Sequence, residues 1–248
     1  MPSTCLCIIT GASRGMGAAI AEQLHRTGAT LLCISRGTNE SLDAEQWTMD
    51  LSEPAPVAER LAHWLGAIDA EEFDSAVLIN NAAIISNIAP LEACDPLELA
   101  RGLRVGLEAP MLLTAAFLRS TLGWRARRDR GCKVLNISSG LGRRAMASAA
   151  GYCAVKAGLD LFSSAVALDQ AASAHPAGIV SLAPGVIDTD MQIHLRAADP
   201  SLFPDHQRFI GLKASNALDS PAAAAAKVIA YLGRADFGTK VIADLRDA

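Results

Sequence analysis

Residues 4–26 read T-C-L-C-I-I-T-G-A-S-R-G-M-G-A-A-I-A-E-Q-L-H-R. The first seven form an apolar run typical of a buried strand, glycines follow at positions 11, 15 and 17, and an alanine-rich amphipathic run begins at Ala18. Strand, glycine-rich turn and helix in this order match the βα unit that binds dinucleotides, in which glycines let the backbone approach phosphate at a helix N-terminus. The spacing G-x-x-x-G-x-G departs from the usual G-x-G-x-x-G, so the prediction depends on the placement after a strand.

The rest of the chain alternates strand-like runs with helical patterns, and no linker or repeat divides it. This alternation predicts an α/β fold: a single doubly wound parallel sheet (Rossmann fold) with helices on both faces, spanning residues 1–248 as one domain. A stretch of poor periodicity at about 190–218 predicts a mobile segment that covers a substrate site. The further strands are expected at 29–34, 47–51, 75–79, 133–138, 178–182 and 239–245, and the two longest helical regions at 96–122 and 152–172.

Composition excludes several classes of function. Hydrophobic residues make up 51% of the 248 residues and charged residues 19%, which supports one large core. A net charge of −4 argues against nucleic acid or an anionic membrane as partner, and we expect the basic cluster at 125–130 to be a solvated loop.

No apolar run approaches the ~18 residues that span a bilayer, and the first one lacks a basic leader, so we expect a cytoplasmic protein. The six cysteines lack metal-ligand spacing, so no metal is predicted.

The second strand ends in Ser35 and Arg36. NAD enzymes place an acidic residue there to hold the ribose 2′-hydroxyl, whereas an arginine suits a 2′-phosphate. Arg14, in the glycine loop, can join Arg36 around that phosphate because arginine forks match phosphate oxygens. The sequence therefore favours NADP over NAD as cofactor. The alternative is that the two arginines are ordinary surface residues.

A second pattern lies between Asn136 and Lys156, which reads N-I-S-S-G-L-G-R-R-A-M-A-S-A-A-G-Y-C-A-V-K. Tyr152 and Lys156 are four residues apart, so on a helix they share one face. A neighbouring cation favours the phenolate and lowers a tyrosine pKa from its usual value near 10, which suits a general acid or base. Ser138 and Ser139 end the preceding strand, where a hydroxyl can donate to a substrate carbonyl oxygen. Taken alone, the pattern also fits a surface helix pair and a turn.

Six motifs together resemble the short-chain dehydrogenase/reductase family over nearly the whole chain. They are T-G-A-S-R-G-M-G at 10–17, D-L at 50–51, N-N-A-A at 80–83, S-S at 138–139, Y-C-A-V-K at 152–156 and P-G-V-I-D-T at 184–189. Each is weak alone, and their order and separations make the match specific.

The resemblance implies roles for individual residues. Ser139 would orient the substrate, Tyr152 would be the acid/base, and Lys156 would lower the tyrosine pKa and hold the nicotinamide ribose. It also implies a homodimer or homotetramer formed through the two long helical regions. The complete set of cofactor residues predicted from pattern and resemblance is Gly11, Ser13, Arg14, Gly15, Met16, Gly17, Ser35, Arg36, Asp50, Leu51, Asn80, Ala82, Tyr152, Lys156, Pro184, Gly185, Ile187 and Thr189.

One departure from the family pattern affects the expected chemistry. Gly106 stands where the family usually has an asparagine that holds a water for proton relay. Three alternatives follow: water fills the vacated volume, a neighbouring group supports the relay, or turnover is slow. A cofactor-binding relative without efficient catalysis is the corresponding alternative function.

The C-terminal third resembles the sepiapterin reductase and benzil reductase-like branch, through A-P-G-V-I-D-T-D-M-Q at 183–192 and V-I-A-D-L-R-D at 241–247. In that branch an aspartate in the closing strand anchors a pterin, and Asp244 is the matching position; a solvent-facing acid is the alternative. Ser139, Tyr152 and Asp244 are therefore the expected substrate-binding residues. The expected activity is NADPH-dependent reduction of a small ketone or dicarbonyl, and a 3-oxoacyl thioester reductase is a further alternative.

Overall fold

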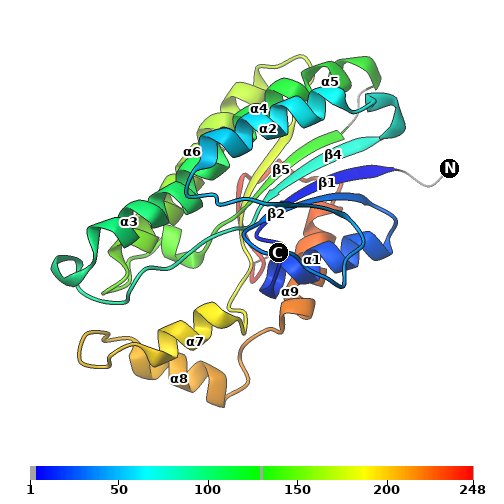
Figure 1. Ribbon diagram of the computed structural model, residues 1–248. Helices are drawn as coiled ribbons and strands as arrows, with labels where there is room; N and C mark the ends of the chain where they lie inside the picture. Colours follow the sequence, from blue (N-terminus) through cyan, green and yellow to red (C-terminus); the bar gives the residue numbers. More distant parts are fainter. Residues whose placement is uncertain (1–3, 129–130, 248) are drawn as a thin grey trace.

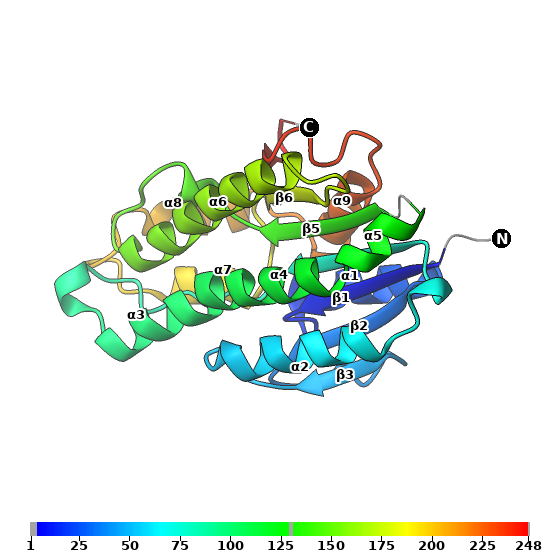
Figure 2. The same cartoon turned by 90° about the horizontal axis from the view of Figure 1, so that it is seen from above.

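The computed structural model describes residues 4–128 and 131–247, and these form one sheet of seven parallel strands (Figures 1 and 2). The spatial order is β3-β2-β1-β4-β5-β6-β7, so the order reverses between β1 and β4. This confirms the predicted doubly wound parallel sheet. The strands are β1 (Cys5–Thr10), β2 (Thr30–Ser35), β3 (Glu45–Thr48), β4 (Ser75–Asn80), β5 (Gly131–Ile137), β6 (Gly178–Ala183) and β7 (Ile242–Asp244).

Helices cover both faces of the sheet (Figure 2). Helices α1 (Gly15–Arg26) and α9 (Pro221–Leu232) pack on one face, and α2 (Pro54–Ala67), α4 (Ala109–Ser120) and α6 (Ala150–Ala171) pack on the other. The remaining elements are α3 (Pro96–Leu103), α5 (Leu122–Arg128), α7 (Asp190–Ala197), α8 (His206–Ala214), the π-helical turn η3 (Arg104–Glu108) and the 3-10 turns η1 (Ala70–Glu72), η2 (Leu91–Ala93) and η4 (Gly140–Gly142).

Strand β1 shows why the central strands are apolar throughout. Cys7 and Ile9 pack toward α1 and α9, whereas Leu6 and Ile8 pack toward α2 and α4, and none of the four is exposed. Successive side chains of a strand point to opposite faces, so a strand covered by helices on both sides must be apolar at every position. Burial of each such side chain contributes about 1.5–3 kcal/mol, and the strong sheet in turn fixes the loops at its carboxyl edge.

The long helical region predicted at 96–122 is an uninterrupted helical run over residues 96–120, and it contains one π turn. Helix α3 ends at Leu103, a π turn follows over η3, and α4 begins at Ala109. Pro110 explains the π turn, because proline has no backbone N–H and its ring clashes with the carbonyl four residues earlier in a regular helix. The wider π turn, closed by Ala109 N–H to the Arg104 carbonyl, accommodates the proline. It also places Gly106 against α6.

The basic cluster at 125–130 is not the solvated loop that we predicted from its charge. Its first residue, Arg125, lies in α5 and is only 3% exposed. The guanidinium donates to Gln170 Oε1 at 2.7 Å and to the His175 carbonyl at 2.6 Å. These two hydrogen bonds of the buried arginine tie α5 to the end of α6. Residues 129–130 lie outside the described residues.

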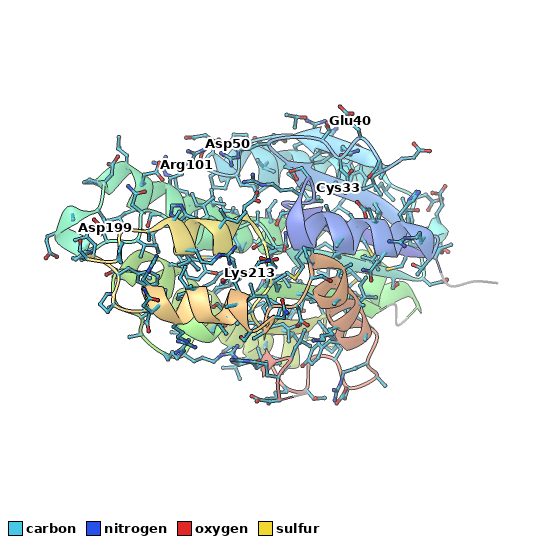
Figure 3. All side chains as sticks on the ribbon, turned by 90° about the horizontal axis from the view of Figure 1, so that it is seen from below. Cys33, Glu40, Asp50, Arg101, Asp199 and Lys213 are labelled. Atoms are coloured by element: carbon cyan, nitrogen blue, oxygen red, sulfur yellow. The ribbon has the colours of Figure 1, made fainter. Side chains whose placement is uncertain are left out.

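The segment at 190–218 forms two short helices, α7 and α8, despite its poor periodicity. They lie beyond the carboxyl ends of the strands and next to each other (Figures 1 and 3). Leu195 of α7, Phe209 of α8 and Phe203 between the two helices form a small separate core that includes Ile88 and Met146. The segment thus packs on loops of the active-site edge rather than on the sheet. Within the described residues, no helix combines the length and the hydropathy that a bilayer crossing requires.

Candidate active site

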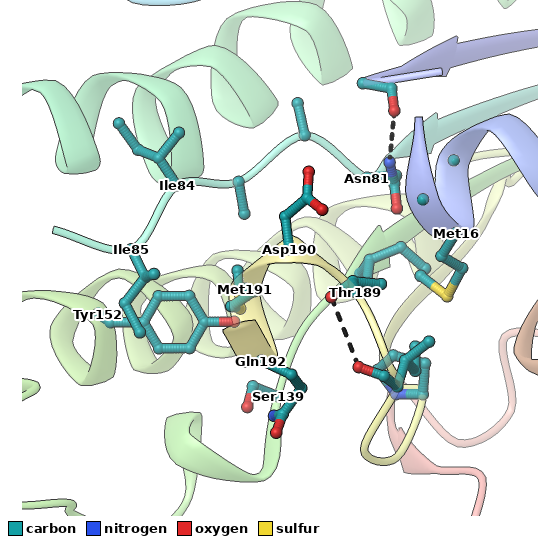
Figure 4. Close-up of a pocket in the computed structure, with 18 of the residues that line it drawn as sticks. Met16, Asn81, Ile84, Ile85, Ser139, Tyr152, Thr189, Asp190, Met191 and Gln192 are labelled. Atoms are coloured by element: carbon teal, nitrogen blue, oxygen red, sulfur yellow. Dashed lines mark hydrogen bonds between the residues drawn. The ribbon is translucent and has the colours of Figure 1, made fainter. Parts of the chain in front are cut away.

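A cavity of about 880 Å³ opens at the carboxyl ends of the strands, where the strand order reverses (Figure 4). Such a switch point is where open α/β sheets bind ligands. The glycine loop after β1 forms one end, the ends of β5 and β6 form the floor, and α7 and α8 contribute to the far wall. The predicted cofactor residues that line this cavity are Gly11, Ser13, Arg14, Gly15, Met16, Gly17, Ser35, Arg36, Asp50, Leu51, Ala82, Tyr152, Lys156, Pro184, Gly185, Ile187 and Thr189.

The glycine loop has the shape of a phosphate cradle. Gly11 and Gly15 have φ angles of +68° and +59°, in the region that favours glycine. A Cβ on Gly17 would lie 2.2 Å from the Gly11 carbonyl oxygen, so only glycine fits there. Arg14 occupies the N-cap of α1 without a side-chain cap bond, and the first turn holds no acid. The N-terminal N–H groups of α1 are therefore not capped by a side chain and fit a bound diphosphate.

Asn81 holds this loop in place, and the sequence prediction missed it. Its side-chain amide donates to the carbonyls of Thr10 at 3.0 Å and Gly11 at 3.2 Å, and its backbone N–H donates to Thr10 Oγ1 at 3.0 Å. The neighbouring Asn80, which we had predicted along the cofactor, lies below the cavity and is 3% exposed. Its amide donates to Asn136 Oδ1 at 2.8 Å. The structure therefore brings Asn81, and not Asn80, to the cavity.

The end of β2 presents a serine and an arginine to the cavity. Ser35 Oγ is buried and has no hydrogen-bond partner among the described residues, and Arg36 is exposed. An unpaired buried hydroxyl beside a free guanidinium fits a phosphate group, because both donate to its oxygens. Arg14 lies farther along the cavity and forms an ion pair with Asp190 of α7 at 3.0 Å. The structure thus joins Arg14 to the covering segment instead of to Arg36.

Ser139, Tyr152 and Lys156 meet at the middle of the cavity. The Tyr152 ring extends into it, with the hydroxyl on the side of Ser139 and Gln192 (Figure 4). Lys156 is 2% exposed, and its ammonium donates to the Ile137 carbonyl at 2.7 Å. The same Nζ lies 5.7 Å from the centroid of the Tyr152 ring. One helical turn of α6 therefore stacks the ammonium behind the phenol, as the four-residue spacing predicts.

The expected lowering of the tyrosine pKa is not found in the cofactor-free chain. Burial raises the pKa of Tyr152 to about 12, although the nearby Ser139 hydroxyl acts in the opposite direction. Burial also lowers the pKa of Lys156 to about 8, against the opposing effect of Asp160. Burial thus outweighs the neighbouring ammonium, which donates to the Ile137 carbonyl and lies 5.7 Å from the centre of the Tyr152 ring.

Val155 fills the volume beside Gly106. A Cβ on Gly106 would lie only 2.5 Å from Val155 Cγ1, and Val155 is 3% exposed. A buried apolar side chain therefore occupies the position that a Cβ of residue 106 would take, which leaves no room there for water. The small residue Gly106 of η3 thus packs directly against the larger Val155 of α6.

This contact predicts an effect on stability. Gly106→Ala should lower the free energy of unfolding by about 1–3 kcal/mol, because a β-branched side chain in a packed core cannot move aside freely. The double variant Gly106→Ala/Val155→Ala should lose less than the sum of the two single losses, since removal of the valine methyls makes room. Urea denaturation measures all three values. Gly102→Ala is the matched control, because Gly102 is also buried and a Cβ there meets nothing. If Gly106→Ala and Gly102→Ala had the same free energy of unfolding, the predicted clash between residue 106 and Val155 would be contradicted.

Asp244 does not line the cavity. Its carboxylate is 7% exposed and accepts from Arg246 Nε at 2.8 Å and from the Arg246 backbone N–H at 3.0 Å. These hydrogen bonds lower the pKa of Asp244 and favour its ionised form, a carboxylate held by Arg246. The residue from this strand end that lines the cavity is Arg246 itself, which the sequence prediction missed.

Chains that join this sheet to a serine, a tyrosine and a lysine at one cavity form a class of nucleotide-dependent oxidoreductases. A model of the short-chain dehydrogenase family matches residues 6–200, and the chain belongs to that family. A benzil reductase ((S)-benzoin forming) from Bacillus cereus is 34% identical over 223 residues, covering 86% of this chain and 88% of the relative. A sepiapterin reductase from Xenopus tropicalis is 30% identical and covers 79% and 80%. A short-chain dehydrogenase/reductase structure from Burkholderia vietnamiensis, 32% identical, superposes with a TM-score of 0.65 over 100% of this chain and 99% of that chain.

Proposed function

We propose that this chain is an NADPH-dependent carbonyl reductase that acts on a small ketone or dicarbonyl. The observation that carries the proposal is the group Ser139, Tyr152 and Lys156 at the centre of a cavity that begins at a phosphate cradle. Membership of the short-chain dehydrogenase family and the two reductase relatives support the same reading.

The cofactor would lie along the cavity, with its diphosphate at the N-terminus of α1 and its 2′-phosphate near Ser35 and Arg36. Asp50 and Leu51 would bound the adenine, and Ile187 with Thr189 the nicotinamide carboxamide. When bound, the nicotinamide supplies the hydride. The remaining chemistry, a proton and an oriented carbonyl, belongs to the chain's own side chains.

Ser139 would donate a hydrogen bond to the carbonyl oxygen of the substrate, and Tyr152 would donate the proton that the alkoxide takes. A pKa of about 12 keeps the Tyr152 phenol protonated at neutral pH. An alkoxide is a stronger base than a phenolate, so this proton transfer is favourable. The cofactor-free state of the site therefore suits reduction better than the reverse reaction, which requires a phenolate base. Lys156 would stabilise the phenolate that remains and hold the nicotinamide ribose.

Apolar side chains surround the substrate end of the cavity: Leu141, Met191, Leu195, Phe209 and Leu212. They suit an aromatic or alkyl carbonyl compound of small size. The benzil reductase and the sepiapterin reductase among the relatives support a vicinal dicarbonyl or a pterin side chain. Because Asp244 is paired with Arg246, the anchoring of a pterin at Asp244 is less well supported than a diketone.

The proposal is tested by mixing the purified chain with NADPH and a panel of aromatic diketones, sepiapterin and a 3-oxoacyl thioester. The loss of NADPH absorbance with a diketone is the expected result. If only the 3-oxoacyl thioester were reduced, the substrate class would be acyl thioesters and not small ketones or dicarbonyls. Binding of NADPH without consumption of any carbonyl would instead favour a cofactor-binding sensor or scaffold. One observation motivates that second candidate: Val155 occupies the space in which a relay group at position 106 would lie.

The cofactor preference has its own test. Arg36→Asp should lower the ratio of kcat/KM for NADPH to that for NADH about tenfold to a hundredfold, because a carboxylate repels the 2′-phosphate and accepts from a 2′-hydroxyl. Steady-state rates with the two cofactors measure the ratio, which corrects for any loss of folded protein. A ratio that does not change would remove Arg36 from the proposed phosphate site.

We further propose a cytoplasmic homodimer or homotetramer formed through α3, α4 and α6. The support is a set of large apolar side chains that are exposed on these helices: Leu97 (78%), Met111 (42%), Leu161 (74%) and Leu168 (74%). Exposed apolar residues that gather on neighbouring helices are typical of subunit contacts.

A further inference from the structure

Arg246 is held in a fixed position at the end of β7. Its Nε donates to Asp244 Oδ1 at 2.8 Å, and a terminal nitrogen donates to the second carboxylate oxygen. Asp244 is fixed in turn, because Arg143 Nη1 lies 3.9 Å from it and Arg143 Nε donates to Asp160 at 3.0 Å. A guanidinium carries five N–H donors, so this two-point contact leaves donors free to bind another group.

The guanidinium lies next to the backbone that carries Ser139. A Cβ built on Gly140, the next residue, would lie 3.3 Å from the terminal nitrogen of Arg246, so the glycine leaves room for the arginine. Arg246 lines the cavity, and its side chain is 60% exposed. It thus lies against the residue that follows Ser139 in the chain and lines the same cavity as Ser139.

Among the described residues, the charged side chains of the cavity lining that have no ion-pair partner are positive. Arg144 and Arg208 also line the cavity, and neither has an ion-pair partner among residues 4–128 and 131–247. The acids of the lining are already paired: Asp50 with Arg101, Asp190 with Arg14, and Asp188 with Arg196 and Lys213. A cavity with unpaired arginines and paired acids attracts anions.

We propose that Arg246, clamped by Asp244 and assisted by Arg144, binds a carboxylate of the substrate, so that the enzyme prefers oxo acids to their neutral esters. This inference deepens the proposed function and rests on it. A carboxylate next to the reacting carbonyl would accept from Arg246 while the carbonyl oxygen accepts from Ser139. Two oxygens bound at once orient the carbonyl carbon for hydride transfer. The same arrangement disfavours cationic substrates.

The test compares phenylglyoxylate with its methyl ester, which share an aromatic 2-oxo carbonyl and differ in charge. The parent chain should reduce the acid with the higher kcat/KM. Arg246→Gln should lower the acid-to-ester ratio of kcat/KM about tenfold to a hundredfold, chiefly through KM of the acid. Arg234→Gln is the matched control, because Arg234 forms the same two-point contact with Asp236, at 2.8 Å for both nitrogens, outside this cavity. Its ratio should equal that of the parent.

A double variant excludes a simpler cause. Arg246→Gln alone uncovers the Asp244 carboxylate, which by itself repels an acid. Asp244→Asn/Arg246→Gln removes both charges, and the acid preference should remain lost. Recovery of the preference in the double variant would overturn the inference, as would a parent chain that prefers the ester.

Calorimetric titration of phenylglyoxylate separates this inference from the proposed function. In one outcome no carbonyl compound is reduced, but phenylglyoxylate binds the parent chain and binds Arg246→Gln at least tenfold more weakly. That outcome supports the carboxylate site and contradicts the proposed reductase activity. If diketones and the ester are reduced but the acid shows no dependence on Arg246, the reductase stands and the carboxylate site fails.

Discussion

Tyr152→Phe should lower kcat for diketone reduction by about 10²–10⁴-fold, the usual contribution of a positioned general acid. The variant keeps the ring, and so keeps the packing over the Lys156 ammonium at 5.7 Å, but it lacks the proton that the alkoxide must receive. The affinity for NADPH should change little, because the glycine loop and Arg36, which would hold the phosphates, belong to other parts of the cavity lining and are not altered.

Two measurements decide the outcome. The loss of NADPH absorbance with a diketone reports turnover, and the fluorescence of bound NADPH reports cofactor affinity. Low turnover with intact affinity is the expected pair of results. A Tyr152→Phe chain that turns over as fast as the parent would remove Tyr152 from the mechanism, and Ser139 or bound water would have to supply the proton. A chain that loses affinity as well would give the hydroxyl a structural role.

The sequence predicts the fold well because its signals are local. An apolar run, glycines and an amphipathic helix within residues 4–26 define one βα unit, and repeated alternation defines the sheet. The Tyr152–Lys156 pair is predictable for the same reason, since four residues on a helix fix one face. The pKa values are not predictable, because they depend on burial by distant parts of the chain.

Contacts between distant segments account for the other differences. Nothing in the sequence around Gly106 indicates that Val155, 49 residues later, fills its space. Helices α7 and α8 are stabilised by a small core with distant loops, which periodicity within 190–218 does not reveal. The choice between Asn80 and Asn81 depends on strand parity: Asn80 ends β4 and points to Asn136 of the adjacent strand, so only Asn81 reaches the loop.

One further difference was visible in the sequence. Asp244 and Arg246 are two residues apart where the strand passes into a turn, and an aspartate often accepts from the backbone two residues later, as Asp244 does from the Arg246 N–H at 3.0 Å. That spacing would have predicted an ion pair in place of a free carboxylate. A charged side chain must therefore be checked for an oppositely charged neighbour in the chain before it is assigned to a ligand.

Gly17→Ala should raise the Kd for NADPH about a hundredfold. The added Cβ would lie 2.2 Å from the Gly11 carbonyl oxygen and 2.4 Å from Asn81 Nδ2, and a backbone atom at that distance cannot be avoided by a rotamer change. The glycine loop must move, and a shift of about 1 Å in a binding group costs about 10²-fold. Because Asn81 ties the loop to β1 through the carbonyls of Thr10 and Gly11, the shift should also break these bonds and lower the unfolding temperature.

Gly37→Ala is the matched control for this prediction. Gly37 lines the same cavity just after Arg36, and a Cβ there meets nothing within 4 Å. Its NADPH affinity and unfolding temperature should remain near those of the parent. Fluorescence titration of NADPH and thermal denaturation, applied to both variants, measure the two effects. If Gly17→Ala binds NADPH as tightly as Gly37→Ala, the loop after β1 is not where the diphosphate lies. The assignment of this end of the cavity to a diphosphate would then lose its main physical support, the uncapped N-terminus of α1.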